Sequence, residues 1–385
     1  MRRAILFALG GLVFSLGQAA TTAKEPDRMT LEEARSLIPE RELPEFWVGK
    51  VEGLSARWEA LQQAEVRIAA LSPGGRPIHR IAFGSHEPVP RLANFNSAVG
   101  AREEAAFADR ARREKPVVFF IGPVHGQETE ALTGLASLVA VMETGRDLAG
   151  RPQRRLRELG ERCRLLIIPV GNPDGVARFE PQTSRGLTGK ESAFWGMGTW
   201  ADATIAHWPT SKRIHPMVGE EVGFLGCYFN DIGVNPMHDE FFEPLSTEAP
   251  AILRIAREEA PDLAVSLHSH ESATAILRPA YVPLEVQQEV RELAERYYPK
   301  LDAAALPRQQ HLFEPRAEGG AHPASLNLTS AVYHTSGATT FTFESPRGIS
   351  DADHGRLSLL QLLDIQLLLY EAMLEHALER HARRP

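Results

Sequence analysis

Cysteine and long apolar runs are scarce in this sequence, and it has no excess of positive charge; each of these shortages excludes a class of protein. Cys163 and Cys227 are the two cysteines among 385 residues, and neither belongs to a Cys-x-x-Cys pair, so thiolate metal ligation is not expected. Two cysteines do not make a disulfide framework, and whether these two pair stays open. Beyond the N-terminus, no run reaches the roughly 20 apolar residues that span a bilayer.

The formal net charge is −8, and a mildly acidic chain has no electrostatic reason to bind nucleic acid. Two short arginine-rich stretches, residues 151–164 and 380–384, are better explained as solvated helix faces than as phosphate-binding patches. Hydrophobic residues make up 43% of the chain and charged residues 24%, as in ordinary soluble globular proteins. The length fits one large domain with additions, or two domains.

The N-terminus has the pattern of a secretory signal peptide. Two arginines follow Met1, residues 4–16 are almost wholly apolar, and small residues suitable for cleavage occupy most of 17–20. An uncleaved N-terminal anchor is the alternative. We therefore expect a signal peptide at residues 1–20, a lead-in segment at 21–50 and a catalytic domain at 51–385, in a periplasmic or secreted protein. Removal of Arg2 and Arg3 changes the formal charge from −8 to −10.

The remaining chain alternates between apolar runs and segments with helical spacing. The runs predict buried strands at residues 116–122, 165–170, 262–268 and 339–344, and a further short strand at 78–83. Helical spacing occurs at residues 51–70, 129–144, 249–260, 284–298 and 354–381. Residues 92–115 favour a loop or an exposed helix, and residues 176–225 form a long irregular segment of a kind that is often functional. This order predicts an α/β fold with a central, mixed and largely parallel sheet flanked by helices.

Ionisable residues lie where these buried strands end. His125, His268 and Glu344 stand at or near the ends of three of the four runs, and the fourth run leads into an Asn-Pro-Asp-Gly turn at residues 172–175. Ligands bind at the carboxyl ends of strands in folds of this kind. These residues are therefore candidates for one functional site.

A metal site is the first function that these residues indicate. His125 and Glu128 are three residues apart, so both side chains can reach one point at the start of a helix, although the pair alone is more typical of a helix cap. A histidine at the end of a buried strand needs a polar partner, and it can be a satisfied core residue instead of a ligand. Both His268 and His270 fit, because alternation puts them on the same side of the strand.

Glu344 ends the last predicted strand, and there it can act as a general base beside a metal. An ordinary strand-end carboxylate is the alternative.

The order of these motifs resembles the zinc metallocarboxypeptidases of the carboxypeptidase A and B type. It comprises His-x-x-Glu, then Asn-Pro-Asp-Gly, then a strand ending in His-Ser, then Tyr and Glu, between Pro116 and Arg347. The resemblance implies one zinc ion bound by His125, Glu128 and His268, with Glu344 as the catalytic base. It favours His268 over His270 because the family's third ligand is commonly followed by serine.

The resemblance also implies substrate-binding residues, with two departures. Tyr333 matches the family's mobile-loop tyrosine, and Asn235 matches an asparagine that holds the substrate's terminal carboxylate. Pro236 stands where the family has an arginine for the same carboxylate, and a proline cannot supply that bidentate contact. A second family arginine polarises the scissile carbonyl group; Arg178 and Arg185 are candidates, and we favour Arg185.

The implied activity is zinc-dependent hydrolysis of a peptide or another amide. Without an arginine at position 236, the need for a free C-terminal carboxylate stays open, and cell-wall peptides are an alternative substrate. A deacylase of the aspartoacylase or succinylglutamate desuccinylase type is the near rival, since its His-Gly-x-Glu motif is much like residues 125–128. A non-catalytic binding protein on the same fold is the third possibility.

Overall fold

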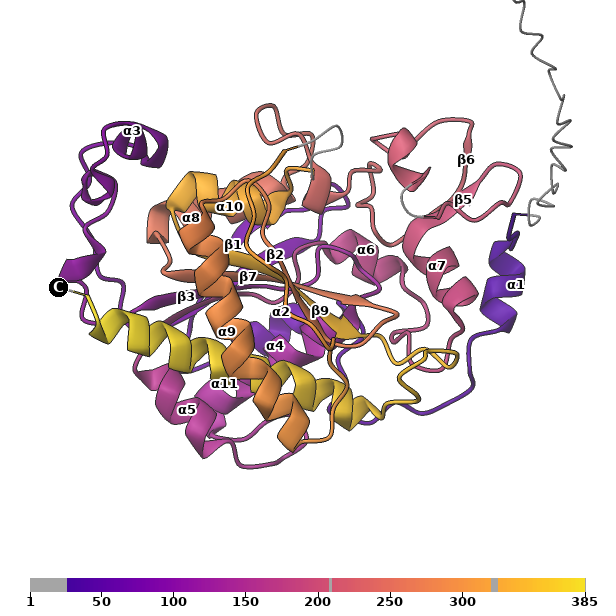
Figure 1. Ribbon diagram of the computed structural model, residues 1–385. Coiled ribbons are helices and arrows are strands. Elements are labelled where there is room, and N and C mark those ends of the chain that lie inside the picture. Colours follow the sequence, from indigo (N-terminus) through magenta and orange to yellow (C-terminus); the bar gives the residue numbers. More distant parts are fainter. Residues whose placement is uncertain (1–25, 208–209, 320–324, 385) are drawn as a thin grey trace, which may run out of the picture.

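The structure, a computed structural model, describes residues 26–207, 210–319 and 325–384 (Figure 1). The expected signal peptide lies outside these ranges. The expected lead-in segment contains one short helix, α1 (Leu31–Ser36). Within the described ranges, no helix combines the length and the apolarity needed to cross a membrane.

A mixed seven-stranded sheet forms the centre of the molecule, and four neighbouring strands in its middle are parallel. The antiparallel strands β1, β2 and β8 lie outside this parallel group. In spatial order the strands are β1 (Glu65–Leu71), β2 (Pro77–Phe83), β4 (Arg164–Ile168), β3 (Val117–Ile121), β7 (Leu263–His270), β9 (Thr339–Pro346) and β8 (Ala275–Leu277). A separate two-stranded sheet consists of β5 (Gly198–Trp200) and β6 (Val222–Leu225).

The central strands β3 and β4 are apolar at every position except Arg164, because both faces of the sheet are covered. Along β3, Val118 and Phe120 pack into one core cluster, whereas Val117 and Phe119 pack into another on the opposite face. Complete burial of each of these side chains stabilises the fold by about 1.5–3 kcal/mol.

Helices from distant parts of the sequence supply the two covering layers, above and below the sheet in Figure 1. The larger layer contains α2 (Leu54–Glu59), α4 (Thr129–Thr144), α5 (Arg154–Glu161), α9 (Leu284–Ala303) and α11 (Leu359–Ala382). The smaller layer contains α8 (Glu248–Glu259) and α10 (Leu328–Ser336). Three further helices lie outside these layers, namely α3 (Phe95–Gly100), α6 (Pro173–Arg178) and α7 (Gly189–Met197). The predicted α/β fold with a largely parallel sheet is therefore confirmed.

Two local expectations differ from the structure, and the structure answers one open question, whether the two cysteines pair. Residues 51–70 form a short helix and then the edge strand β1, because one half-exposed face of that strand mimics helical spacing. The turn at residues 172–175 begins α6, with the Asn172 side chain accepting a hydrogen bond from the Gly175 amide as the N-cap. Cys163 and Cys227 are free and buried in different core clusters, and burial raises the pKa of each thiol to about 12.

A buried ion-pair cluster joins α8 to strands β2 and β4. The Glu259 carboxylate accepts hydrogen bonds from Arg164 at 2.8 and 2.9 Å and from Arg80 at 3.0 Å, and His86 lies 2.9 Å away. Burial alone would raise the pKa of Glu259, but Arg164, with His86 beside it, outweighs this effect and lowers the pKa to about 2.

The lowered pKa of Glu259 predicts a loss of stability in acid. The ionised carboxylate stabilises the fold fully above its unfolded pKa of about 4.3, and this contribution disappears as the pH falls towards 2. Glu259→Gln should therefore lower the free energy of unfolding at pH 7 by about 3 kcal/mol and flatten its dependence on pH below 4.5. Urea unfolding across this pH range measures both effects. The exposed residue Glu220 provides a matched control, and equal losses in Glu220→Gln would contradict the assignment.

Candidate active site

His125 and Glu128 are brought together by the loop between β3 and α4. Glu128 is the N-cap residue of α4, and the loop lies against the start of α6. A Cβ atom on Gly126 would lie 1.9 Å from the Gly175 carbonyl carbon, so only glycine fits there. The Gly126 amide donates a hydrogen bond to the Cys227 carbonyl oxygen at 2.7 Å, which fixes the loop on its other side.

His268 and Glu344 are neighbours across two parallel strands. They are register partners near the carboxyl ends of β7 and β9. His268 is 2% exposed, and its Nε2 lies 2.9 Å from the Ser266 hydroxyl. Glu344 is less deeply buried and lines the adjoining cavity, and desolvation is the largest cause that raises its pKa to about 7.

Three ligand atoms converge at one point between these elements. The Nδ1 atoms of His125 and His268 lie 3.1 Å apart, and each is 3.0 Å from an oxygen of Glu128. These three residues form a buried group whose ligand atoms all lie within 4.8 Å of one another. The structure thus unites the three predicted ligands.

The chemistry of this donor set fits a zinc ion. Two imidazoles and a carboxylate are typical protein ligands of a catalytic zinc site, which keeps a further position open. The contact of His268 Nε2 with Ser266 leaves Nδ1 to face Glu128, as in metal sites where a second partner fixes the tautomer. Two buried ring nitrogens that face each other beside a carboxylate form an electron-rich site. A cation there would be a partner for both nitrogens and for the carboxylate.

His270 lies in the same cavity but outside this group. Its Nε2 is 2.9 Å from the Ala273 carbonyl oxygen, beyond the strand end. The two histidines therefore have different surroundings, which the sequence could not show.

The structure predicts that only one of the two histidines is needed to retain zinc. Mutation of a residue that supports a metal ligand typically lowers metal affinity by about 10–100-fold. His268→Ala removes a ligand itself, so we expect a larger loss of zinc affinity. His270→Ala is the matched control and should retain zinc. Metal analysis after dialysis measures both. Zinc loss confined to His270→Ala would contradict the assignment.

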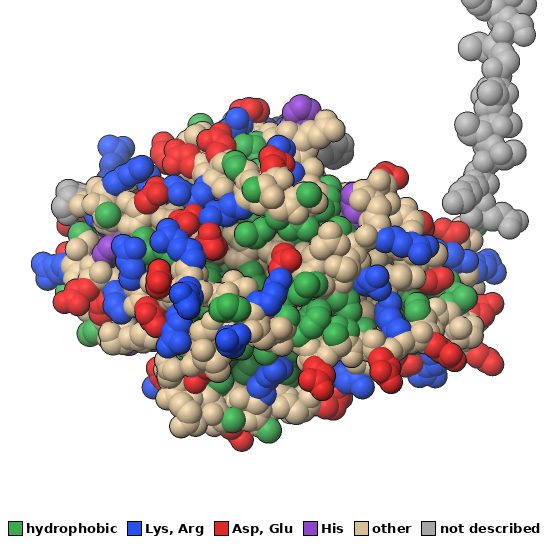
Figure 2. Space-filling view, turned by 90° about the horizontal axis from the view of Figure 1, so that it is seen from below, with side chains coloured by type: hydrophobic (Ala, Val, Ile, Leu, Met, Phe, Trp, Pro, Cys, Tyr) green, Lys and Arg blue, Asp and Glu red, His purple; other side chains and the backbone are tan. Residues whose placement is uncertain are grey.

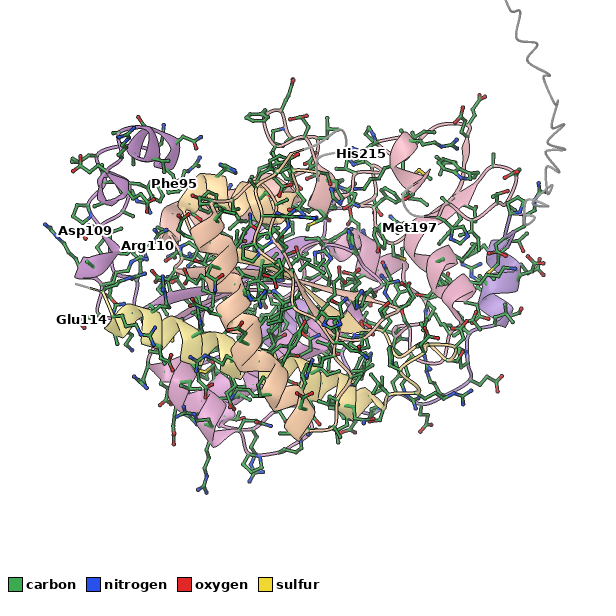
Figure 3. All side chains as sticks on the ribbon, in the orientation of Figure 1. Phe95, Asp109, Arg110, Glu114, Met197 and His215 are labelled. Carbon is green, nitrogen blue, oxygen red and sulfur yellow. The ribbon has the colours of Figure 1, made fainter. Side chains whose placement is uncertain are left out.

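A cavity of about 970 Å³ is lined by His125, His268 and Glu344. Met197, labelled in Figure 3, is one of its walls. The charged and imidazole side chains in its lining are Asp27, His125, Lys190, His207, His238, His268, His270, Glu271, Glu344 and Arg347. This volume is large enough for a peptide-sized ligand.

Arg347 joins the parts of the site, and our sequence analysis missed this role. Its guanidinium donates hydrogen bonds to Glu128 at 3.3 Å, to Glu271 at 2.8 Å and to the Tyr228 hydroxyl at 3.2 Å. It also binds the Ser269 carbonyl oxygen at 3.0 Å. The sequence feature that could have revealed Arg347 is its position directly after the end of β9, three residues beyond Glu344.

Tyr228 is a second residue that the sequence did not reveal. Its ring stacks on His125 with centroids 3.7 Å apart, and burial, the largest cause, raises the pKa of its hydroxyl. No motif marks this residue, because the contact joins positions about a hundred residues apart in the chain.

Asn235 lies in a side pocket next to the main cavity. The pocket has a volume of about 250 Å³ and shares Tyr228 and His238 with the main cavity. The Asn235 side chain caps the 3-10 turn Pro236–His238 by accepting a hydrogen bond from the Met237 amide. Lys212 and His215 also line this pocket, and Figure 3 labels His215.

The other residues expected to bind substrate do not line the main cavity or the side pocket. Tyr333 packs in a hydrophobic cluster, edge-on to Phe95 at 5.4 Å between ring centroids. The Nε of Arg185 donates a hydrogen bond to the Leu357 carbonyl oxygen at 2.7 Å. Arg178 donates hydrogen bonds to the carbonyl oxygens of Gly226 and Phe229. Arg347, which we did not predict from the sequence, is instead the arginine that contacts the ligand residue Glu128.

Comparison with known proteins identifies the family. The family model described as zinc carboxypeptidase matches residues 60–348. No curated protein matches the chain. Among solved structures, a candidate carboxypeptidase of Burkholderia mallei is 17% identical over 85% of this chain and 67% of that chain, with a TM-score of 0.50, and supports the fold.

Two further solved structures are similar to this chain. A metallo-carboxypeptidase of Burkholderia cenocepacia is 16% identical over 84% of this chain and 67% of that chain, with a TM-score of 0.49. Carboxypeptidase A of Helicoverpa armigera is 15% identical over 91% and 80%, with a TM-score of 0.48. Because the family model spans most of the chain, this protein belongs to the zinc carboxypeptidase family and is a hydrolase of the metallocarboxypeptidase type.

Proposed function

We propose that this chain is an exported peptidase that hydrolyses a peptide or amide bond with one zinc ion and with Glu344 as general base. The observation that carries the proposal is the register pairing of His268 with Glu344 beside a converging donor set. Zinc bound by His125, Glu128 and His268 would supply a Lewis acid that activates water and polarises a carbonyl group.

Residues of the protein itself would transfer the protons and hold the site in place. Glu344 lines the cavity, and its Oε2 is buried without a hydrogen-bond partner among the described side chains and backbone, so no protein donor occupies this oxygen. It would take a proton from the attacking water and pass it to the leaving nitrogen. Arg347 would hold Glu128 and Tyr228 in place, since it contacts both.

The residues that line the cavity identify a peptide substrate less specifically than the ligand residues identify the metal. Asn235 remains our proposed substrate contact, because it lines the side pocket. Pro236 begins the 3-10 turn there and supplies no cation. A deacylase that cleaves N-acyl amino acids remains the second candidate, and the missing arginine is the observation in its favour.

Export is proposed from the sequence alone. The basic start, the apolar stretch and the small residues before position 21 support removal of a signal peptide. Expression in a bacterial host, followed by fractionation and N-terminal analysis, tests it. A full-length chain in the cytoplasmic fraction would contradict it.

A substrate panel on zinc-loaded protein tests the activity. We expect turnover of peptides, because the cavity accommodates more than a single amino acid. The panel compares free-acid peptides, the same peptides as C-terminal amides, cell-wall peptides and N-acyl amino acids, with product release as the measurement. Preference for N-acyl amino acids would favour the deacylase, and tight zinc binding without any turnover would favour a binding protein.

A further inference from the structure

A second polar cavity lies at the end of the sheet opposite the active site. It has a volume of about 330 Å³ and contains the first residues of two neighbouring parallel strands, Leu263 of β7 and Thr339 of β9. The catalytic residues lie at the carboxyl ends of the same strands. In Figure 3, Arg110, which lines this second cavity, is on the other side of the molecule from Met197 and His215. We call it the amino-end cavity.

Arginine dominates the charged lining of this cavity. Its charged and imidazole side chains are Arg110, Asp262, Glu289, His376, Arg380, Arg383 and Arg384. Arg110 comes from the 3-10 turn Arg110–Arg112, and the other three arginines come from the last turn of α11 and the two residues that follow it. Figure 2 shows Lys and Arg side chains among Asp and Glu side chains on the left, the side on which the C-terminus lies in Figure 1, and further Lys and Arg side chains on the right.

Both carboxylates in the lining are already engaged. Asp262 forms an ion pair with Arg384, lies 3.7 Å from Arg110 and 3.9 Å from the buried Arg113, and accepts a hydrogen bond from the Val117 amide. Glu289 accepts hydrogen bonds from the Thr339 hydroxyl at 2.9 Å and from Arg380 at 3.3 Å, and His376 lies 3.4 Å away. Four arginines therefore share the two carboxylates of the described lining, and Arg383 also lies 3.7 Å from Glu379 outside the lining.

This imbalance is costly because part of the charge is buried. Desolvation is the largest cause that lowers the pKa of Arg110 to about 10, and the nearby Arg113 and Arg384 add to it against the opposing effect of Asp262. Guanidinium groups that outnumber their carboxylate partners in a confined space attract a further anion, and their forked donors suit oxygen anions.

We propose that the amino-end cavity binds a small, doubly charged oxygen anion, phosphate or sulfate, free or as a group on a small molecule. The bound anion would link the end of α11 to the first residues of β7 and β9 and to the turn at Arg110. The arginine-rich stretch at residues 380–384, which the sequence favours as a solvated helix face, would then be in part a binding element. This proposal is independent of the hydrolytic activity.

Calorimetric titration of the zinc-loaded protein with inorganic phosphate tests the proposal, with ionic strength held constant by sodium chloride. We expect saturable binding, and at least a tenfold loss of affinity in the double variant Arg380→Gln/Arg383→Gln, because each removed cation takes a charge-assisted hydrogen bond. Both arginines are exposed, at 47% and 71% of their side chains, so the variant should fold. A parallel titration with sulfate shows whether the site needs a phosphoryl group.

A matched control separates this site from general electrostatics. Arg67→Gln/Arg157→Gln removes the same charge from two arginines that do not line the cavity and each form an ion pair elsewhere, so it should leave affinity unchanged. Phosphate bound at the zinc ligands would persist in both double variants. Absence of saturable binding, or equal affinity in the wild type and Arg380→Gln/Arg383→Gln, would overturn the proposal.

Discussion

Replacement of Glu344 by glutamine is expected to lower kcat by about 10²–10⁴-fold, the usual contribution of a positioned general base. Glutamine keeps the size of the side chain but cannot take a proton. The three zinc ligands are unchanged, so the variant should contain as much zinc as the wild type. Steady-state kinetics on the best substrate of the panel, together with metal analysis, measures both quantities.

Glu271→Gln is the matched control for this experiment. Glu271 lines the same cavity, but its carboxylate is bound by Arg347 at 2.8 Å. Its replacement should therefore affect kcat much less than Glu344→Gln does. If Glu344→Gln retained full kcat, or lost its zinc along with its activity, the assignment of the base would be wrong.

Loss of Arg347 should affect both stability and activity. Its side chain is 5% exposed, and Arg347→Met leaves the carboxylate of Glu128 without its buried guanidinium partner. Removal of one member of a buried ion pair costs about 3–5 kcal/mol. We expect a decrease of this size in the free energy of unfolding by urea, and a lower kcat because Glu128 and Tyr228 lose a shared contact.

Arg185→Met is the matched control for Arg347. It removes an arginine outside the cavity, and the hydrogen bond from its Nε to the Leu357 carbonyl oxygen is worth about 1 kcal/mol. It should leave kcat unchanged. A large loss of kcat in Arg185→Met with a normal Arg347→Met would instead restore the arginine that the family pattern favours.

The sequence predicted the centre of the fold well because the central strands are buried on both faces. A strand such as β3 needs apolar residues at every position, so the pattern is continuous and easy to recognise. The half-exposed edge strand β1 differs from the helix that its spacing predicts, since its exposed and partly buried positions follow no strict alternation. Periodicity is therefore informative only where the surroundings of a strand are uniform.

The same distinction applies to the site. His268 and Glu344 lie on strands and are brought together by the parallel register, and His125 and Glu128 lie in the loop between β3 and α4. Tyr228 and Asn235 belong to the segment between β6 and α8, whose path no periodic pattern specifies. Tyr333 follows the family's order of residues, yet α10 holds it in a hydrophobic cluster, because helix packing decides where its ring lies.

The pairing of His268 with Glu344 on adjacent strands also bears on how the enzyme could change over time. Both residues are fixed by the hydrogen-bonded ladder of β7 and β9, whereas Tyr228, Asn235 and His238 come from an irregular connection. Insertions or exchanges in that connection could alter which molecules are accepted without disturbing the pair. If Asn235 contacts the substrate as proposed, selectivity and bond cleavage are encoded in separable stretches of the chain. A library confined to residues 235–246, which leaves Cys227 and Tyr228 unchanged beside the ligand loop, would then explore the first while preserving the second.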